Sequence, residues 1–152
     1  MSFEPDFIAR LKQIFEEKIV FNKVIGLRID TIAAEGVTAH VDMRPELIGH
    51  FAHQRLHGGV ISATLDAMGG LAVMAAIGAR HLDEPPEARL TRFAKLGTID
   101  LRIDYLRPAT GPRFVARAEV MRLGSRVAST RMEFLDAGER LLSTGAGAYI
   151  VS

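Results

Sequence analysis

Hydrophobic residues recur along this chain with two different periods, which divide it into predicted helices and strands. From Pro5 to about Val20, apolar side chains repeat every three or four residues with charges between them, which predicts an amphipathic helix. Short strands are predicted near Ile25–Ala33 and Val37–Met43, joined by a turn at Ala34-Glu35-Gly36. In the second strand apolar and polar residues alternate, so one face should point inward.

The middle of the chain combines an irregular segment with a long apolar one. Pro45–Leu56 has no clear period and is predicted to be a loop that leads into a helix. His57–Gly78 is apolar and small on every side, so this helix is expected to be buried all round. Its charge-free part, Ala67–Ala79, is shorter than the roughly 20 residues that a bilayer span requires. We therefore expect a core helix and no membrane span.

The C-terminal half is rich in strands that are separated by short turns. The predicted strands are Thr98–Leu106, Phe114–Leu123, Val127–Leu135 and Leu141–Val151. In the first of them, Ile99, Leu101, Ile103 and Tyr105 are expected on one face. Because such short turns join antiparallel strands, the element order predicts an α+β fold with an antiparallel sheet packed on a central helix. No repeat or linker interrupts residues 1–152, which predicts a single domain.

Composition narrows the classes of function. The chain has 19 basic and 18 acidic residues, so its net charge of +1 gives no reason to expect a nucleic-acid surface. It has no cysteine, which excludes disulfides, thiolate zinc sites and a cysteine nucleophile. The N-terminal residues lack the pattern of a secretory signal, and together these features lead us to expect a cytoplasmic protein. The five histidines have no carboxylate in suitable register, so no metal site is predicted.

Asp66 is the most informative residue, because it is the only ionisable side chain between Gly58 and Ala79. An unpaired carboxylate in a buried helix costs several kcal/mol in order of magnitude, so some interaction or function should offset that cost. Asp66 could be a satisfied structural carboxylate, a group paired at a dimer interface, or part of an exposed stripe. It could also be a catalytic carboxylate.

The sequence Leu56-His57-Gly58-Gly59 stands at the head of the same helix. The free N–H groups of a helix N-terminus carry partial positive charge, which favours a polarised carbonyl or a developing oxyanion. Eight residues separate Gly58 from Asp66, or about 12 Å of helical rise, so one substrate atom cannot contact both in one chain. If the two cooperate, they are expected to come from two copies of the chain across a dimer axis.

Two motifs in this chain resemble those of a known family. His57-Gly58-Gly59-Val60 followed by Leu65-Asp66 is similar to the helix signature of hotdog-fold thioesterases of the phenylacetic-acid-degradation (PaaI-type) branch, and Thr98–Ala109 resembles that family's strand ending in Tyr-Leu-Arg-Pro. The resemblance covers roughly residues 24–150. It implies a hotdog fold, a sheet wrapped around a long helix, with residues 1–22 as an additional helix before a core of 24–151. It also implies hydrolysis of acyl-CoA to free acid and CoA without a further cofactor, in a homodimer or homotetramer with sites at the dimer interface.

The resemblance also implies roles for residues. Asp66 would attack the thioester or activate water, the Gly58 N–H would polarise the carbonyl, and the Thr98 hydroxyl would orient Asp66 or the water. His57 belongs to the motif, although it could simply pack at the helix entry. The family often has an amide side chain in the preceding loop, and this chain has Phe51 at that position. Gln54, His53 or His50 could replace it, and His53 is preferred because it can donate a hydrogen bond.

For coenzyme A, the resemblance points to Arg107 on the strand end, the turn Gly124-Ser125-Arg126, and Gly59. The guanidinium fork suits phosphate oxygens, although ordinary surface chemistry would explain the same residues. Two alternative functions remain open: a hydratase or dehydratase of acyl thioesters, and a sensor that binds acyl-CoA without cleaving it. The acyl group is not identified by the sequence. Candidate residues for an apolar tunnel, each of which could equally be core, are Phe51, Met68, Val73, Met74 and Ile77.

Overall fold

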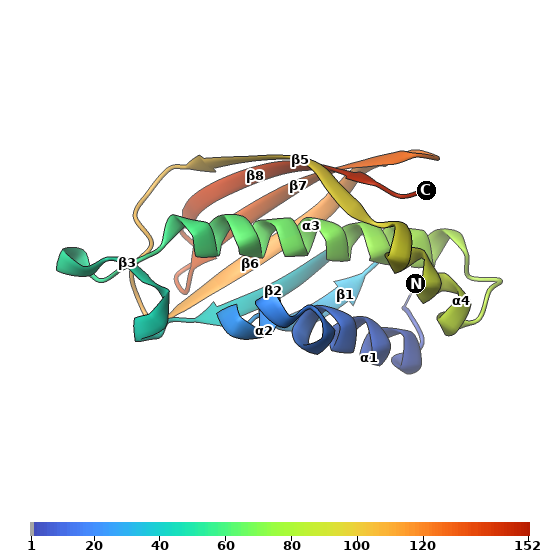
Figure 1. Ribbon diagram of the computed structural model, residues 1–152, viewed down its shortest axis with the longest axis horizontal. Coiled ribbons are helices and arrows are strands. Elements are labelled where there is room, and N and C mark those ends of the chain that lie inside the picture. Colours follow the sequence, from blue (N-terminus) through green and yellow to red (C-terminus); the bar gives the residue numbers. More distant parts are fainter. Residues whose placement is uncertain (1) are drawn as a thin grey trace.

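The alternating segments of the sequence form one antiparallel sheet of six strands, in the spatial order β1-β2-β6-β7-β8-β5. The computed structural model describes residues 2–152, and Figure 1 shows the sheet lying across one long helix, α3. The strands are β1 (Arg28–Ala33), β2 (Gly36–Asp42), β5 (Gly97–Tyr105), β6 (Arg113–Leu123), β7 (Val127–Asp136) and β8 (Leu141–Ile150). The helices are α1 (Pro5–Gln13), α2 (Val20–Ile25), α3 (Gly58–Arg80) and α4 (Pro86–Leu90).

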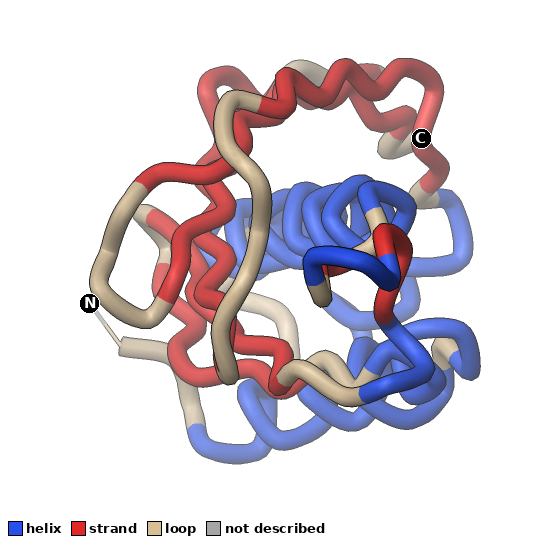
Figure 2. The backbone as a smooth tube through the Cα atoms, turned by 90° about the vertical axis from the view of Figure 1, so that its left-hand side faces the viewer, coloured by secondary structure: helices blue, strands red, loops and turns tan. Residues whose placement is uncertain are grey.

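The predicted α+β class and hotdog fold are confirmed, because the sheet wraps around the central helix. Seen from the end in Figure 2, the strands curve round two sides of α3, and the N-terminal helices lie beneath it. On β2 the alternation is as predicted: Val37, Ala39 and Val41 are buried against the helix. Burial of such apolar faces is the main favourable contribution to folding.

α3 has the length and apolarity of a membrane-crossing helix, yet 67% of its most apolar window is buried inside the protein. From Met68 to Gly78 every residue except Ala76 is buried, and Met68, Val73, Met74 and Ile77 are at most 5% exposed. The prediction that this helix is buried all round is wrong for its N-terminal half. That half leaves a partly exposed stripe of small residues, Gly59, Ser62, Ala63 and Ala67, together with Asp66.

The N-terminal segment is not the single helix predicted for Pro5 to Val20. α1 passes into a π-helical turn, Ile14–Lys18, which ends at Ile19, and α2 then continues to Ile25. Gly26 closes α2 in the left-handed conformation (φ 79°), so β1 begins three residues later than predicted. α1 is anchored by Arg89, whose fully buried guanidinium donates to Glu4 at 2.5 Å and lies 4.5 Å above the Phe7 ring.

The segment predicted as a loop contains short elements of its own. Pro45–Leu56 holds the small hairpin of β3 (Ile48–His50) and β4 (Arg55–Leu56), with 3-10 turns at Pro45–Leu47 and Phe51–His53. A further 3-10 turn, Thr91–Lys95, follows α4. These elements are too short to give a periodic signal in the sequence.

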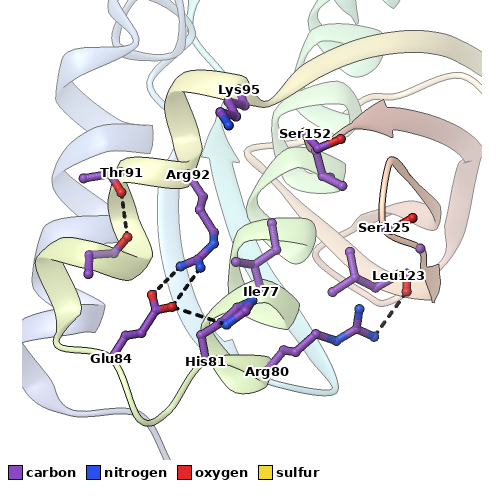
Figure 3. Close-up of a pocket in the computed structure, with 13 residues that line it drawn as sticks. Ile77, Arg80, His81, Glu84, Thr91, Arg92, Lys95, Leu123, Ser125 and Ser152 are labelled. Carbon is purple, nitrogen blue, oxygen red and sulfur yellow. Dashed lines mark hydrogen bonds and ion pairs between the residues drawn. The ribbon is translucent and has the colours of Figure 1, made fainter.

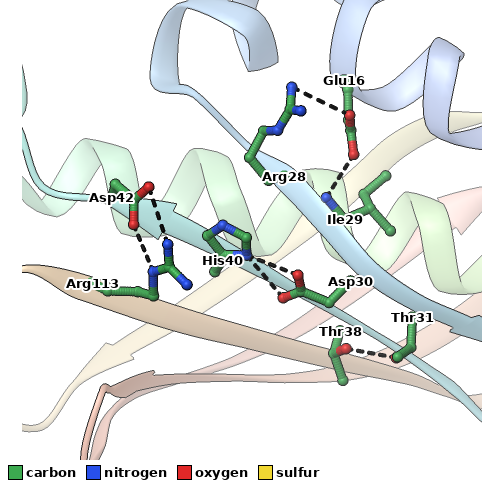
Figure 4. A network of polar contacts seen from close by, with 9 residues as sticks. All are labelled: Glu16, Arg28, Ile29, Asp30, Thr31, Thr38, His40, Asp42 and Arg113. Atoms are coloured by element: carbon green, nitrogen blue, oxygen red, sulfur yellow. Dashed lines mark hydrogen bonds and ion pairs between the residues drawn. The ribbon is translucent and has the colours of Figure 1, made fainter.

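The two edges of the sheet differ in how they are covered. At β1, the backbone N–H of Ile29 donates to the Glu16 carboxylate at 2.8 Å, and Arg28 lies 3.6 Å from the same carboxylate. Figure 4 shows this contact beside the polar outer face, where Asp30 bonds His40 and Asp42 bonds Arg113. At the other edge, β5 pairs only with β8. The open backbone groups of an edge strand are available to a further strand.

Candidate active site

Asp66 lies in the middle of α3, where the helix faces the beginning of β5. Its Oδ1 accepts a hydrogen bond from the Thr98 hydroxyl at 2.7 Å. The Tyr149 hydroxyl on β8 donates to the Asp66 backbone carbonyl at 2.8 Å and lies 3.2 Å from Oδ1. Thr98 and Tyr149 are directly opposite each other across the β5–β8 pair. Two neighbouring strands therefore hold one carboxylate in place.

A β-bulge explains how Thr98 reaches the helix. The register between β5 and β8 shifts between Thr98 and Asp100, so Ile99 is an extra residue. A regular strand would place Thr98 and Leu101 on opposite faces, because side chains alternate. The prediction that Ile99 shares the inner face with Leu101 is wrong, and Ile99 is 56% exposed. The bulge turns Thr98 toward Asp66 without disturbing the rest of the strand.

Tyr149 is a site residue that sequence reasoning missed. Its ring is 1% exposed, and burial, followed by the negative charge of Asp66, raises the pKa of the Tyr149 hydroxyl above its ordinary range. The hydroxyl therefore remains a proton donor at neutral pH. Gly69 makes room for the ring, since a Cβ there would lie 2.7 Å from Tyr149 Cζ. Only the pairing of β5 with β8 reveals this role, and that pairing is not written in the local sequence.

The surroundings of Asp66 exclude one of its alternative roles. Its side chain is half-buried on the wall of a cavity of about 290 Å³, and it forms no ion pair within residues 2–152. The rest of the cavity wall is largely apolar. Its other lining residues are Phe15, Ile19, Phe21, Asn22, Ala63, Ala67, Gly70, Phe93, Leu96, Gly97, Thr98 and Tyr149. A structural ion pair is thus excluded in the described chain, and the carboxylate is available to a ligand in the cavity.

The N-terminus of α3 is capped by His57. Its Nδ1 accepts the Gly59 N–H at 2.8 Å, so that N–H is already used within the chain. Tyr105, a second site residue not predicted from sequence, donates its hydroxyl to the Gly58 carbonyl at 2.8 Å. The Gly58 N–H, at the first helical position, has no acceptor in the part of the chain that the structure describes. Gly58 thus presents a free donor at the positive end of the helix dipole.

The loop before α3 does not reach Asp66 within one chain. Gln54 donates to the Phe51 carbonyl at 2.9 Å, and the His50 and His53 rings lie 4.8 Å apart. The Phe51 side chain is 81% exposed. Across residues 2–152 no group of three or more histidine or acidic side chains is placed to hold a metal ion. None of the loop side chains lines the cavity at Asp66.

Of the residues predicted to contact coenzyme A, Gly124 and Ser125 line one cavity, Arg107 lines another, and Gly59 and Arg126 line neither. Gly124 and Ser125 line a cavity of about 490 Å³ at the C-terminal end of α3 (Figure 3), together with Arg80, Arg92 and Lys95. Within it, the hydrogen bond from Arg92 lowers the pKa of Glu84 and keeps that carboxylate charged. The Arg126 side chain is exposed beside this turn and does not line the cavity.

Arg107 lies at the opposite end of α3, in a cavity of about 330 Å³ that Gly58 and Tyr105 also line. Its guanidinium donates to the Leu141 carbonyl at 2.8 Å. α3 has 23 residues, so the two cavities are separated by roughly 30 Å of helix. One phosphate group therefore cannot contact both sets of residues within a single chain.

A sheet wrapped around a helix that presents one carboxylate to an apolar cavity defines the class of hotdog thioesterases. The sequence profile of the Thioesterase superfamily matches residues 53–143, and the chain belongs to this superfamily. It is 32% identical over 139 residues to the medium/long-chain acyl-CoA thioesterase YigI of Escherichia coli (strain K12), covering 91% of this chain and 90% of that one.

Two solved structures share the fold of this chain over nearly its whole length. A Shewanella oneidensis protein related to the thioesterase superfamily superimposes with a TM-score of 0.91 at 37% identity, covering 99% of this chain and 100% of that one. A structure from Syntrophus aciditrophicus gives a TM-score of 0.84 at 35% identity, with 97% of each chain covered. The N-terminal helices are included in these matches, so they are part of the shared architecture.

Proposed function

We propose that this protein hydrolyses acyl-CoA thioesters in the cavity at Asp66, and that its acyl groups are of medium or long chain. The observation that carries the proposal is a carboxylate free of ion pairs within residues 2–152, held by Thr98 on the wall of an apolar cavity. Membership of the thioesterase superfamily and the activity named for the Escherichia coli relative support it. With no cysteine in the chain, we place this activity in the reducing cytoplasm.

In the proposed reaction, Asp66 removes a proton from water, and the water oxygen attacks the thioester carbonyl carbon. The C–S bond then breaks, and the departing CoA thiolate takes the proton that Asp66 received. Alternatively, Asp66 itself attacks the carbonyl carbon, the C–S bond breaks to expel the CoA thiolate, and water then hydrolyses the resulting anhydride and supplies the proton that the thiolate takes. After a single turnover in ¹⁸O-labelled water, an unlabelled acid with the label on Asp66 identifies direct attack, because water has then opened the anhydride at the Asp66 carboxyl carbon. In both routes Thr98 fixes the carboxylate.

We propose that a second copy of the chain supplies the carbonyl-polarising donor. The β1 edge is occupied by Glu16, whereas β5 is open and lies beside the small-residue stripe of α3. Two copies paired through β5 about a two-fold axis would place their α3 helices antiparallel. The free Gly58 N–H of one copy could then approach the Asp66 of the other, which the 12 Å separation along one helix prevents. A dimer, or a tetramer of such dimers, is the expected assembly.

The same arrangement would reconcile the two groups of predicted coenzyme A residues. Antiparallel helices bring the Arg107 end of one copy toward the C-terminal half of the other. We assign the phosphates to the cavity at Gly124 and Ser125, where Arg80, Arg92 and Lys95 supply three cations against the single carboxylate of Glu84. Arginine binds phosphate oxygens through two parallel donors.

The test is thiol release from a panel of acyl-CoAs by the wild type, Asp66→Asn and Asp66→Ala. Wild-type turnover that falls at least about a hundredfold in both variants supports the proposal. Asp6→Asn is the matched control, because Asp6 forms only an exposed ion pair with Arg10 on α1. Tight acyl-CoA binding without turnover by the wild type would instead identify a sensor, and hydration of an enoyl-CoA would identify a hydratase.

A further inference from the structure

The N-terminal segment does more than cover the sheet, because it forms one wall of the cavity at Asp66. Phe15, Ile19, Phe21 and Asn22 line the cavity from this segment, opposite Ala67 and Gly70 of α3. Phe15 is 2% exposed, while Phe21 is 61% exposed, so the cavity runs from solvent at Phe21 to the core at Phe15.

The π-helical turn determines how these side chains are presented. The Ile19 N–H donates to the Ile14 carbonyl at 2.9 Å, five residues back, and Ile19 then leaves the helix with ψ 93°. The Phe15 carbonyl thereby loses the N–H that would bond it in an α-helix. The buried side-chain amide of Asn22 donates to this carbonyl instead, with 3.0 Å between Nδ2 and the oxygen. π-helical turns are rare in proteins, and those that occur are often found at functional sites. Here the turn, fixed by Asn22, directs both Phe15 and Ile19 toward α3.

The chemistry of the lining indicates which part of an acyl-CoA this cavity accepts. The polar groups of the lining lie at the Asp66 end. There the hydroxyls of Thr98 and Tyr149, from two paired strands, contact the Asp66 carboxylate. Away from that end, Asn22 is the only polar side chain among the described residues that line the cavity, and its amide already donates to the Phe15 carbonyl. The amides of pantetheine would lose hydrogen bonds in such surroundings, whereas a hydrocarbon chain would not. The lining therefore favours an acyl chain over pantetheine.

The inner end of the cavity is closed by a small aromatic cluster. Phe15 meets Phe93 edge to face, with ring centroids 5.6 Å apart. Gly70 leaves space beside them, since a Cβ there would lie 3.5 Å from Leu96 Cδ2 and 3.6 Å from Phe15 Cε1. These are ordinary contact distances, so one added methyl group fits the cavity without displacing its wall.

We propose that the N-terminal segment sets the length of the acyl chain, with Phe15 and Gly70 at the closed end and Ile19 along the side. The inference rests on the proposed hydrolysis at Asp66. Each methylene that the cavity buries should raise kcat/KM about fourfold, until the chain reaches the closed end. Beyond that length the gain should stop.

The experiment measures kcat/KM across saturated acyl-CoAs of increasing length for three variants and the wild type. Gly70→Ala should move the break in the profile to a shorter chain, because its added methyl group occupies the closed end, and alanine also favours the helix. Ile19→Ala should move the break to a longer chain, because loss of that side chain enlarges the cavity and lets it bury further methylenes before the chain is blocked. Ile14→Ala is the matched control, because Ile14 is a half-buried isoleucine of the same π turn that does not line this cavity.

The outcomes are distinct. A break that stays at the same chain length in Gly70→Ala and Ile19→Ala, with short-chain turnover intact, overturns the inference and leaves the hydrolase assignment standing. An equal shift in Ile14→Ala also overturns it, since the effect would then be general loosening of the segment. A wild type that releases no thiol from any acyl-CoA refutes the hydrolase and this inference together. If Gly70→Ala does not fold, Ile19→Ala alone decides.

Discussion

The proposed role of the Gly58 N–H can be tested by removing that single donor. Gly58→Pro deletes the N–H, and proline is well tolerated at the first position of a helix. His57, the preceding residue, already has ψ 132°, within the range that a following proline requires. Gly58→Ala is the matched control, because it adds the same Cβ, 3.2 Å from the Tyr105 ring, while it retains the N–H. The difference between the two variants isolates the hydrogen bond.

The expected magnitude follows from comparable donors. Loss of one donor to an oxyanion lowers kcat by about 10²- to 10³-fold, or about 3 to 4 kcal/mol of transition-state stabilisation. The free energy of unfolding should change little, because the Gly58 N–H bonds no acceptor within residues 2–152. Thiol release gives kcat, and urea denaturation gives stability. Equal kcat values for Gly58→Pro and Gly58→Ala would refute the assignment of this donor.

Mixing the inactive variants tests whether the site is shared between copies. In a mixed dimer of Gly58→Pro and Asp66→Asn, one site carries both substitutions and the other carries neither. Random exchange of an equal mixture makes about half of the dimers mixed, and one of the two sites in each mixed dimer is intact. The mixture should therefore recover about a quarter of wild-type activity. No recovery, with subunit exchange demonstrated, would show that the two residues do not serve one site across an interface.

Three further predictions concern the groups around Asp66. Thr98→Val should lower kcat/KM about 10- to 100-fold, because it removes a charge-assisted hydrogen bond to Asp66. Thr98→Ser keeps the hydroxyl and should stay within about threefold of wild type. Equal losses in the two variants would show that the hydroxyl has no role in catalysis. Because the folded state keeps the Tyr149 proton above pH 10 while the unfolded state releases it, wild-type stability should fall there by about 1.4 kcal/mol per pH unit from this group. Urea denaturation between pH 9 and 11 should show a shallower slope for Tyr149→Phe, and an identical slope would contradict the raised pKa. Gly69→Ala should destabilise the protein by about 1 to 3 kcal/mol, since its Cβ would overlap the buried Tyr149 ring, and an unchanged denaturation midpoint would contradict this packing.

The sequence by itself determined the long strands, the central helix and the residue at the centre of the site. The period of two on β2, the unbroken apolar run of α3 and the short turns between the last strands are local features, and each indicated its element correctly. Asp66 was recognisable because a single charge in an apolar helix requires an explanation, whatever the surrounding fold. The resemblance on residues 57–66 and 98–109 then connected that charge to thioester hydrolysis.

The tertiary structure decided which groups surround that charge. The bulge at Ile99 reverses the side-chain alternation of β5, and the pairing of β5 with β8 brings Tyr149 opposite Thr98. The π turn of the N-terminal segment aims Phe15 into the cavity. Strand order, register and turn type depend on contacts between residues far apart in the chain, and the sequence near each residue contains no signal for them. Such long-range contacts, rather than local propensity, place a hydroxyl within 2.7 Å of Asp66.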